Sequence, residues 1–422
     1  MPIDHSIKNR LLAIQKKAVA NLKDNVLPFW TRATWDQEQG GFLTRLDRAG
    51  NVIDASEKLL IKQVRMLWSL SAAHRFGITD KGYLELAHRG FDYIIRTMWD
   101  NNEGGFYFSV ARDGRPLNKR KNTDFHGYAL IGLAEYYSAS KRPEALAWGN
   151  RVFDVLAEKA RDGELGFREE FDGGKWPVLN SEQMNLGDRP DIKTIDMHTN
   201  ILEGFIYLSR ASADPRHLKA LRDVFQLIIG KGIHPEQRCG ITAFDCEWNP
   251  VPDVNGRWTT SYGLNAELAW LLLAAVDLLH YSRETYQGAI LGLIDHALNN
   301  GFDQERGGLA AFGPLNGHVL SAGDLPANRL LKSWWAQAEM LNALVYAYEW
   351  TRQDKYLEAF EKLFDWIWRH QIDHECGDWY QDLFWDSGKP VTTEKGREWK
   401  TAFHASRALM QASQAIDRII SA

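Results

Sequence analysis

The chain repeats one short pattern, an acidic turn that closes on glycine, along its whole length. The runs are WDQEQGGF at 35–42, WDNNEGGF at 99–106, RDGELGF at 161–167, PEQRCGI at 235–241, FDQERGGL at 302–309 and IDHECGDW at 372–379. Their reference glycines, at positions 41, 105, 166, 240, 308 and 377, are 64, 61, 74, 68 and 69 residues apart. Regular spacing of this size is typical of proteins built from copies of one unit. The spacing therefore predicts six units of similar length.

Each unit shows the same predicted order of elements. Residues 83–99 carry apolar side chains three or four positions apart, which indicates an amphipathic helix before the acidic turn, and residues 356–372 repeat that helix. After the glycine, alternating residues around a turn dipeptide predict β-hairpins at 42–54, 106–118, 167–179, 309–321 and 379–391. A second, more apolar helix follows, as at 59–76 and 265–280.

Six such helix pairs could form an open array or a closed ring. Open arrays need atypical, polar terminal units, and neither end of this chain looks atypical. We therefore predict an all-α fold, an (α/α)6 barrel of six helix-hairpin-helix repeats with the short hairpins over one mouth. We expect residues 1–422 to form a single catalytic domain of this kind.

Composition and charge narrow the class of function. The net charge of -5 argues against a nucleic-acid or anionic-membrane partner, because both need a basic surface. With 17 Trp, 14 Tyr and 19 Phe, the chain has many flat faces of the kind that stack on sugars. Three scattered cysteines, a charged first segment and the lack of 18 uninterrupted apolar residues predict a reducing, cytoplasmic location without a membrane span.

Polar residues recur at the start of the apolar helices, directly after each predicted hairpin. Because buried polar groups are costly unless they are paired, we predict that these helix ends share one cavity. The residues are Gln63, Arg65, Asp124, His126, Asp196, His198, Asn200, Asn265, Glu267, Trp334, Trp335, Gln337, Glu339, Lys400 and His404.

Each of these residues also has a purely structural interpretation. Alone, His404 would be a satisfied core histidine, and its neighbours Trp399 and Lys400 favour a base instead. Arg65 either neutralises a buried glutamate or holds a substrate hydroxyl. We expect His126 to be a hydrogen-bonding residue behind the site.

No cofactor or metal site is predicted. The sequence has no P-loop, G-x-G-x-x-G, G-x-S-x-G or H-E-x-x-H motif. His370 and His374 are four residues apart but have no third strong ligand nearby. The residues therefore favour acid-base chemistry by histidine and glutamate on a neutral, polyhydroxylated molecule.

Three runs resemble the N-acylglucosamine 2-epimerase family, and within it the cellobiose 2-epimerases and the mannose isomerases or epimerases. They are KSWWAQAEMLNALVYAY at 332–348, REWKTAFHASRA at 397–408 and KLLIKQVRMLW at 58–68. The resemblance implies the (α/α)6 fold and the isomerisation or epimerisation of reducing sugars at C2 without a redox cofactor.

The resemblance also implies roles for individual residues. His404 would take or return the C2 proton, Arg65 would hold substrate oxygens, and Trp335 and Trp379 would line the sugar site. Glu339 would be the acid paired to the site. His198 stands on a family histidine, and Asn200 stands where related enzymes often have another histidine. We predict His404, His198 and Glu267 as catalytic residues. The predicted substrate-binding residues are Arg65, Trp335, Trp379, Asn200, Gln337, Glu339 and His126.

One departure from the family pattern affects the mechanism. In SYGLNAELAWLL at 261–272, Leu264 replaces the histidine that normally acts as the second acid-base group. Either Asn265, Glu267 or His198 has taken over part of that work, or the reaction needs one base. The substitution favours isomerisation without excluding epimerisation.

The sequence therefore predicts a cofactor-independent enzyme that acts at C2 of an uncharged reducing sugar, through ring opening and an enediol. We expect a monomer or a homodimer. A glycoside hydrolase or lyase using Glu267 and Glu339, or a degenerate sugar-binding protein, are the alternatives.

Overall fold

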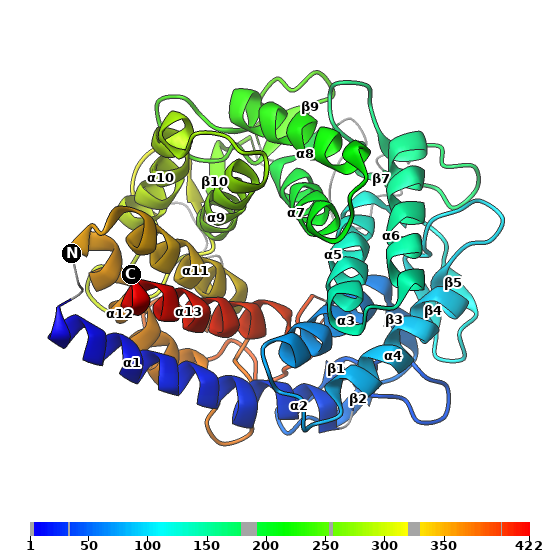
Figure 1. The fold of residues 1–422 in the computed structure, drawn as a ribbon, viewed down its shortest axis with the longest axis horizontal. Helices are drawn as coiled ribbons and strands as arrows, with labels where there is room; N and C mark the ends of the chain where they lie inside the picture. Colours follow the sequence, from blue (N-terminus) through cyan, green and yellow to red (C-terminus); the bar gives the residue numbers. More distant parts are fainter. Residues whose placement is uncertain (1–3, 33, 179–191, 253–255, 320–329, 398) are drawn as a thin grey trace.

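Paired helices form a ring with two layers, one helix of each pair facing the centre and the other lying outside it (Figure 1). The computed structural model describes residues 4–32, 34–178, 192–252, 256–319, 330–397 and 399–422. The inner helices are α3 (Leu60–Arg75), α5 (Thr123–Ser140), α7 (Ile195–Ala211), α9 (Tyr262–Leu278), α11 (Trp334–Thr351) and α13 (Phe403–Ser421). The outer helices are α1 (His5–Ala20), α2 (Leu27–Arg32), α4 (Tyr83–Tyr93), α6 (Pro143–Val155), α8 (Pro215–Leu227), α10 (Arg283–Asn300) and α12 (Asp354–Trp366). Short π-helical turns join or end outer helices at η1 (Asn21–Val26), η2 (Ile94–Met98), η3 (Leu156–Ala160), η4 (Ile228–Gly232) and η7 (Ile367–Gln371).

Burial separates the two layers. Every residue of α3 from Leu60 to Ala73 is buried, which is typical of a helix surrounded by other elements. The outer helix α4 buries one stripe that includes Ala87 and Phe91, and the stripe continues through η2. The amphipathic helix predicted at 83–99 is therefore confirmed. None of the helices in the described ranges is both long and apolar enough to cross a bilayer.

The ring closes where the two ends of the chain meet. Helix α13 packs against α11 and α3, and α1 covers α13 from outside. Figure 1 shows α1 in blue beside α13 in red. An open array would leave its first and last helix pairs apart, so the prediction of closure is confirmed. The chain has the architecture of an α/α barrel.

Short strands connect consecutive helix pairs. Their bounds are β1 (Arg45–Leu46), β2 (Val52–Asp54), β3 (Glu57–Leu59), β4 (Ser109–Ala111), β5 (Pro116–Asn118), β6 (Lys121–Asn122), β7 (Glu170–Phe171), β8 (Ile192–Thr194), β9 (Ala243–Asp245), β10 (Thr259–Ser261), β11 (Phe312–Pro314), β12 (Leu331–Ser333) and β13 (Asp382–Phe384). The strand before each inner helix from α3 to α11 pairs with a strand that follows the next acidic turn, in β3–β4, β6–β7, β8–β9, β10–β11 and β12–β13. These ladders therefore link one helix pair to the next.

This pairing only partly matches the predicted hairpins. The hairpins at 42–54 and 106–118 are confirmed as β1–β2 and β4–β5. Within the predicted hairpins at 167–179 and 379–391, the two halves pair through a single β-bridge each, Phe171 with Val178 and Leu383 with Pro390. In the fourth run, β11 pairs with β10 of the preceding unit. Positions 179 and 320–321 lie outside the described residues.

A buried lysine holds each of five acidic turns. Each lysine lies in the strand or loop that precedes an inner helix, and its ammonium group forms an ion pair with the aspartate of the turn. The pairs are Lys58–Asp36 (3.1 Å), Lys121–Asp100 (2.9 Å), Lys193–Asp162 (2.7 Å), Lys332–Asp303 (2.8 Å) and Lys395–Asp373 (3.1 Å). In the remaining turn, Thr260 Oγ1 donates to the Gly240 carbonyl oxygen at 2.9 Å instead. This recurring contact fixes the loops that carry the inner helices.

Replacing Asp100 by alanine tests how much one of these lysine–aspartate pairs contributes to stability. The Lys121 side chain is fully buried, so the variant leaves its ammonium without a carboxylate in a site of low dielectric. We expect the free energy of unfolding to fall by about 3 kcal/mol in urea denaturation. The control is Asp113→Ala, because Asp113 pairs with Arg115 on the surface and its side chain is 47% exposed. That change should cost less than about 1 kcal/mol. Equal losses in both variants would contradict a special role for the buried pair.

Candidate active site

The first turns of the inner helices surround a cavity of about 410 Å³ at one end of the ring. The residues that line this cavity come from distant parts of the sequence. They meet because every inner helix begins at the same end of the ring. Its lining residues are Arg65, Asp124, Tyr128, Asp196, Asn200, Glu267, Phe312, Ser333, Trp334, Trp335, Gln381, Asp382, Trp399 and His404. The predicted shared cavity therefore exists, and it contains a histidine, an arginine, several carboxyls and a group of aromatic rings.

His404 lies in the first turn of α13 and is held by a carboxylate. Its Nδ1 lies 2.7 Å from Oε1 of Glu339. An ionised carboxylate only accepts hydrogen bonds, so Nδ1 carries the hydrogen and Nε2 keeps its lone pair. Burial, together with the charges of Arg65 and Arg407, holds the pKa of His404 well below its usual range. The imidazole is therefore neutral at neutral pH and can accept a proton.

Tryptophan rings flank this imidazole. The ring centroids of Trp334 and Trp335 lie 6.2 and 6.3 Å from that of His404. Trp334 is almost fully buried, whereas Trp335 is half-buried and also contacts Phe312. Flat apolar faces beside a base suit the C–H surface of a sugar ring. The arrangement can hold a sugar next to Nε2.

Arg407 anchors the carboxylate behind His404. It lies one turn after His404 on α13, is fully buried, and donates from Nη2 to Glu267 Oε1 (2.6 Å) and Glu339 Oε1 (2.8 Å). Its Nη1 donates to Glu203. Trp270 Nε1 also donates to Glu339, at 2.9 Å. The carboxylate that orients His404 is thus fixed by a buried cation and an indole, which keeps the imidazole in one position.

Charge in this network is unbalanced. One guanidinium faces three carboxylates, and burial combined with the neighbouring glutamates raises the pKa values of Glu203, to about 7, and Glu267. The pKa of Arg407 itself is raised well above its usual range, because the attraction of the three glutamates outweighs the effect of burial. Removing the arginine would therefore leave several buried charges without a partner.

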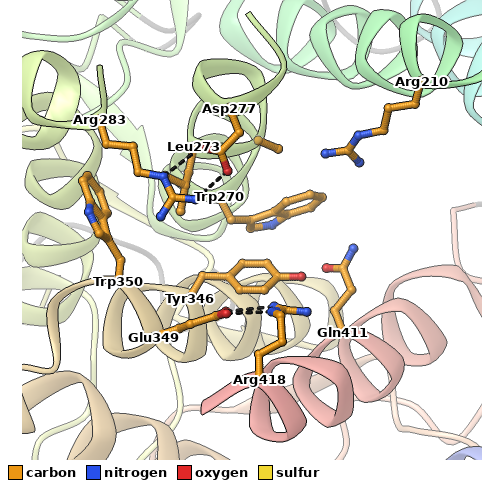
Figure 2. A pocket seen from close by; sticks show the side chains of 11 residues that line it. Arg210, Trp270, Leu273, Asp277, Arg283, Tyr346, Glu349, Trp350, Gln411 and Arg418 are labelled. Atoms are coloured by element: carbon orange, nitrogen blue, oxygen red, sulfur yellow. Dashed lines mark hydrogen bonds and ion pairs between the residues drawn. The ribbon is translucent and has the colours of Figure 1, made fainter. Parts of the chain in front are cut away.

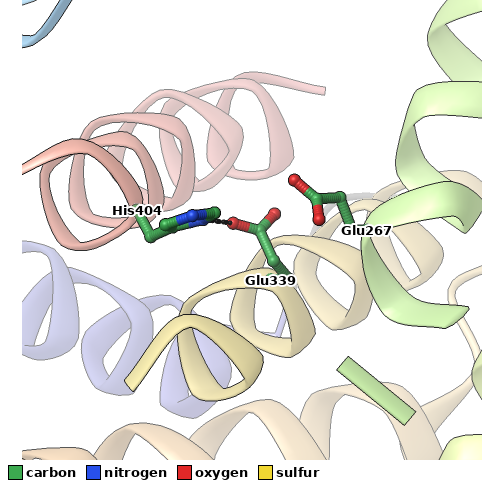
Figure 3. Close-up of side chains that lie close together, drawn as sticks. All are labelled: Glu267, Glu339 and His404. Atoms are coloured by element: carbon green, nitrogen blue, oxygen red, sulfur yellow. Dashed lines mark hydrogen bonds and ion pairs between the residues drawn. The ribbon is translucent and has the colours of Figure 1, made fainter. Parts of the chain in front are cut away.

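Glu267, Glu339 and His404 also form a group with the donor types that bind cations. One ligand atom from each lies within 4.8 Å of the others, and Figure 3 shows the three side chains converging. Arg407 Nη2, however, already donates to one oxygen of each of these two carboxylates. A metal ion there would have to displace a fully buried guanidinium, so the residues present fit the arginine better than a metal.

Arg65 lies at the cavity wall and does not neutralise Glu267 or Glu339, since Arg407 does. Its Nη1 donates to the Trp399 carbonyl oxygen at 2.7 Å, and its guanidinium stacks 4.1 Å from the centroid of the Tyr128 ring. Its Nε has no hydrogen-bond partner among the described residues. A positioned cation with a spare donor suits an oxygen that becomes negatively charged.

Several predicted site residues hold backbone instead of lining the cavity. They occupy equivalent places on the inner helices and accept a hydrogen bond from the backbone N–H that closes an acidic turn. The bonds are Phe42 to Gln63, Phe106 to His126, Phe167 to His198, Gly240 to Asn265 and Leu309 to Gln337. The repeated polar positions thus reflect a repeated structural contact, and the residues that line the cavity lie elsewhere on the same helix ends.

Two of the predicted site residues, His198 and Trp379, are not among the residues that line the cavity. His198 Nε2 accepts from Phe167 N, and its Nδ1 contacts the Thr194 carbonyl oxygen, so neither ring nitrogen remains for a substrate. Trp379 is fully buried and donates from Nε1 to Asn21 Oδ1 at 2.9 Å. His126 is engaged in the same way as His198, as expected for a residue behind the site. Among the predicted residues, the cavity brings together His404, Arg65, Trp335, Asn200 and Glu267, with Glu339 directly behind His404.

Sequence reasoning did not single out Arg407, Asp124 and Asp196 as site residues. Arg407 is three positions after His404, so both side chains share one helix face, and that spacing was the available signal. Asp124 and Asp196 stood among the polar helix starts, but nothing in the sequence distinguished them from the residues that hold turns.

A second pocket lies at the opposite end of the ring, where the inner helices finish. It measures about 260 Å³ and is shown in Figure 2. Two of its arginines are paired: Arg283 with Asp277 at 2.7 Å, and Arg418 with Glu349 at 2.6 Å. It is lined by no histidine. Its chemistry is that of paired surface charges, so the cavity around His404 is the candidate active site.

Comparisons with known proteins give the family and agree with the fold. The family model described as N-acylglucosamine 2-epimerase (GlcNAc 2-epimerase) matches residues 40–408. Cellobiose 2-epimerase of Bacteroides fragilis is 26% identical over 400 residues, covering 94% of this chain and 98% of that protein. The structure of cellobiose 2-epimerase from Spirochaeta thermophila matches with a TM-score of 0.87 and 28% identity, over 99% of this chain and 100% of that one. A D-mannose isomerase shares the fold, with a TM-score of 0.79 at 19% identity over 96% of this chain and 97% of that one.

Proposed function

Because the chain belongs to the N-acylglucosamine 2-epimerase family, we propose that it acts at C2 of an uncharged reducing sugar, as an epimerase or an aldose-ketose isomerase. The observation that carries the proposal is the neutral imidazole of His404, oriented by Glu339 beside tryptophan rings in a cavity. Relatives named cellobiose 2-epimerase support a sugar substrate, and the fold shared with a D-mannose isomerase adds mannose to the candidates.

The charges of the cavity favour a neutral substrate. Among the described residues that line it, Arg65 is the one arginine or lysine, against carboxyls from Asp124, Asp196, Glu267 and Asp382. A phosphorylated or carboxylated sugar would meet repulsion from those of these groups that are ionised, whereas hydroxyl groups can form hydrogen bonds with all of them. We therefore propose mannose, glucose, fructose or the reducing end of a disaccharide as the substrate class.

The proposed reaction moves only protons. After the sugar ring opens, the aldehyde acidifies the hydrogen on C2, and Nε2 of His404 removes it as general base. The resulting enediolate oxygen lies near Arg65, whose guanidinium stabilises the developing charge. Return of the proton to C1 gives a ketose, and return to the other face of C2 gives the epimer. No electron leaves the substrate, so the chemistry requires no redox cofactor.

Glycoside hydrolysis is less well supported. It needs two carboxyls on either side of the scissile bond, and Glu267 with Glu339 was the predicted pair. Glu339 is fully buried behind His404, and both carboxylates accept from the same nitrogen of Arg407. A pair held on one side by a common cation cannot flank a glycosidic oxygen.

We also propose that residues 1–422 form one catalytic domain made of six copies of the helix, turn, hairpin and helix unit. The recurring Lys–Asp pairs and the recurring turn bonds of the inner helices support this architecture. We propose a cytoplasmic enzyme that works as a monomer or homodimer on a small-molecule sugar.

Incubation with mannose, glucose, fructose and cellobiose in D2O tests the proposed function. We expect deuterium to enter C2 or C1 of at least one sugar, together with a new ketose or epimer, in proton and deuterium NMR spectra. New reducing ends from cellobiose would instead indicate hydrolysis. Sugars that bind, as followed by titration calorimetry, but remain unlabelled would indicate a binding protein.

A further inference from the structure

We propose that the carboxyl of Asp124 is the second acid-base group of this enzyme and protonates C2 on the face opposite His404, so that the product is the C2 epimer. This inference rests on the proposed function and adds the residue and the stereochemistry. It takes up the question raised by Leu264, which cannot transfer a proton.

The order of helices around the ring places Asp124 away from His404, next to the helix that lies across the ring from it. Neighbouring inner helices are in contact in the order α3, α5, α7, α9, α11 and α13, and α13 returns to α3. His404 begins α13, and the helix directly across the ring is α7, which carries Asp196 and Asn200 in its first turns. Asp124, in the first turn of α5, adjoins them. All four side chains line the same cavity, so a bound sugar lies between them and His404.

Asp124 has an oxygen without a partner. Its Oδ1 is buried and makes no hydrogen bond to any described residue. Asn200 is 3% exposed, and its Oδ1 also lacks a partner in the described part of the chain. The Asn200 Nδ2 donates to Asp196 Oδ1 at 3.3 Å. Asp124 and Asn200 both line the cavity, and each has a buried acceptor oxygen without a partner among the described residues, so a further donor group is expected there.

The surroundings keep a proton on Asp124. Burial and the negative charge of Asp196 raise its pKa to about 8, against the opposing effect of Arg65. Burial and Glu267 raise the pKa of Asp196 to about 6. The other charged or titratable groups that line the cavity with Asp124 are Arg65 on α3, Asp196 on α7, Glu267 on α9, and His404 and Asp382. At neutral pH the cavity thus holds a neutral base on one side and a protonated carboxyl on the other.

The other candidates for this role are already engaged. Glu267 accepts from Arg407. Both ring nitrogens of His198 contact backbone. Asn265 accepts from Gly240 N and donates to Thr260. Asp124 combines a place at the cavity wall with a buried oxygen that has no partner among the described residues.

The proposed step balances in protons and electrons. Nε2 of His404 takes the C2 proton, and the C–H electron pair forms the C1–C2 double bond of the enediolate. The Asp124 carboxyl then gives its proton to the opposite face of C2, and the C1 carbonyl forms again. The enzyme is left with an imidazolium and a carboxylate. Exchange of protons with solvent restores the starting state.

Replacing Asp124 by asparagine tests this assignment, because the amide keeps the shape and cannot give up a proton. With the most active sugar of the panel, we expect C2 deuteration of the starting sugar to persist, while epimer formation falls about 100-fold. Circular dichroism and thermal unfolding should match the parent protein. The alkaline limb of the pH profile for epimer formation, expected near the pKa of about 8, should be lost.

Asp196→Asn is the companion variant. Removing its charge should lower the pKa of Asp124, so the alkaline limb should move to lower pH while epimer is still formed. A merely structural role for Asp124 would leave these limbs in place. Unchanged epimer formation in Asp124→Asn, or a parent protein that makes only ketose, would overturn the inference and leave the proposed function intact. Absence of deuterium exchange in the parent protein with every sugar would overturn both.

Discussion

Replacing His404 by alanine is expected to abolish exchange of the substrate C2 hydrogen with solvent, a loss on the order of 10⁴-fold. The reason is that in the proposed mechanism Nε2 of His404, at the cavity wall and held in place by Glu339, is the general base. Deuterium incorporation at C2, followed by NMR at saturating sugar, is the measurement. The far-ultraviolet circular dichroism spectrum should stay the same, since the helices are held by contacts throughout the ring.

His198→Gln is the matched control for this variant. Glutamine stands at the equivalent positions of two other inner helices, where Gln63 and Gln337 accept the same backbone hydrogen bond. We therefore expect His198→Gln to keep the acidic turn in place and to leave the exchange rate nearly unchanged. Loss of exchange in His198→Gln, or retained exchange in His404→Ala, would reverse our assignment of the base.

Replacing Arg407 by methionine should produce the largest loss of stability. Glu203, Glu267 and Glu339 would remain buried without their shared cation, which should lower the free energy of unfolding by about 5 kcal/mol. Urea denaturation near pH 7.5 would measure this loss. Arg418→Met on the same helix is the control, because Arg418 pairs with Glu349 at the surface and should contribute less than about 1 kcal/mol.

The same variant should recover stability in mild acid. Burial raises the pKa values of Glu203 and Glu267 and Arg407 opposes that effect, so without Arg407 both pKa values should rise further above those of the unfolded chain. A carboxyl with a raised pKa in the folded state binds its proton more tightly there, so folding is favoured as pH falls. The difference from the parent protein should therefore shrink between about pH 7 and about pH 5. A difference independent of pH would indicate lost packing as the main cause.

The sequence predicted the ring better than the site. Apolar periodicity and the acidic-glycine turns are local signals, so the helix pairs and their order could be read directly. Strand partners could not, because β10 and β11 lie in different units and no local pattern encodes their pairing. Which polar residues line the cavity was equally hidden, since His198 and His404 both begin apolar helices, and only the three-dimensional contacts separate the first from the second.

The resemblance to known sequences transferred some roles and not others. Arg65, Trp335 and His404 do line one cavity. Trp379 is instead fully buried, and it donates a hydrogen bond to Asn21. The charge balance of the site depends on Arg407, whose guanidinium pairs with glutamates more than 60 residues away in sequence. Contacts of that range follow from the packed ring and cannot be read from local sequence patterns.

Closure of α13 against α1 and α3 has a consequence for biosynthesis. During translation the amino-terminal helices leave the ribosome long before their carboxy-terminal partner exists, and contacts of such long range form late in folding. The same closing helix contributes both His404 and its anchor Arg407. A nascent chain arrested before residue 403 would therefore expose an apolar seam and lack the proposed base, so the proposed activity would depend on synthesis of this helix.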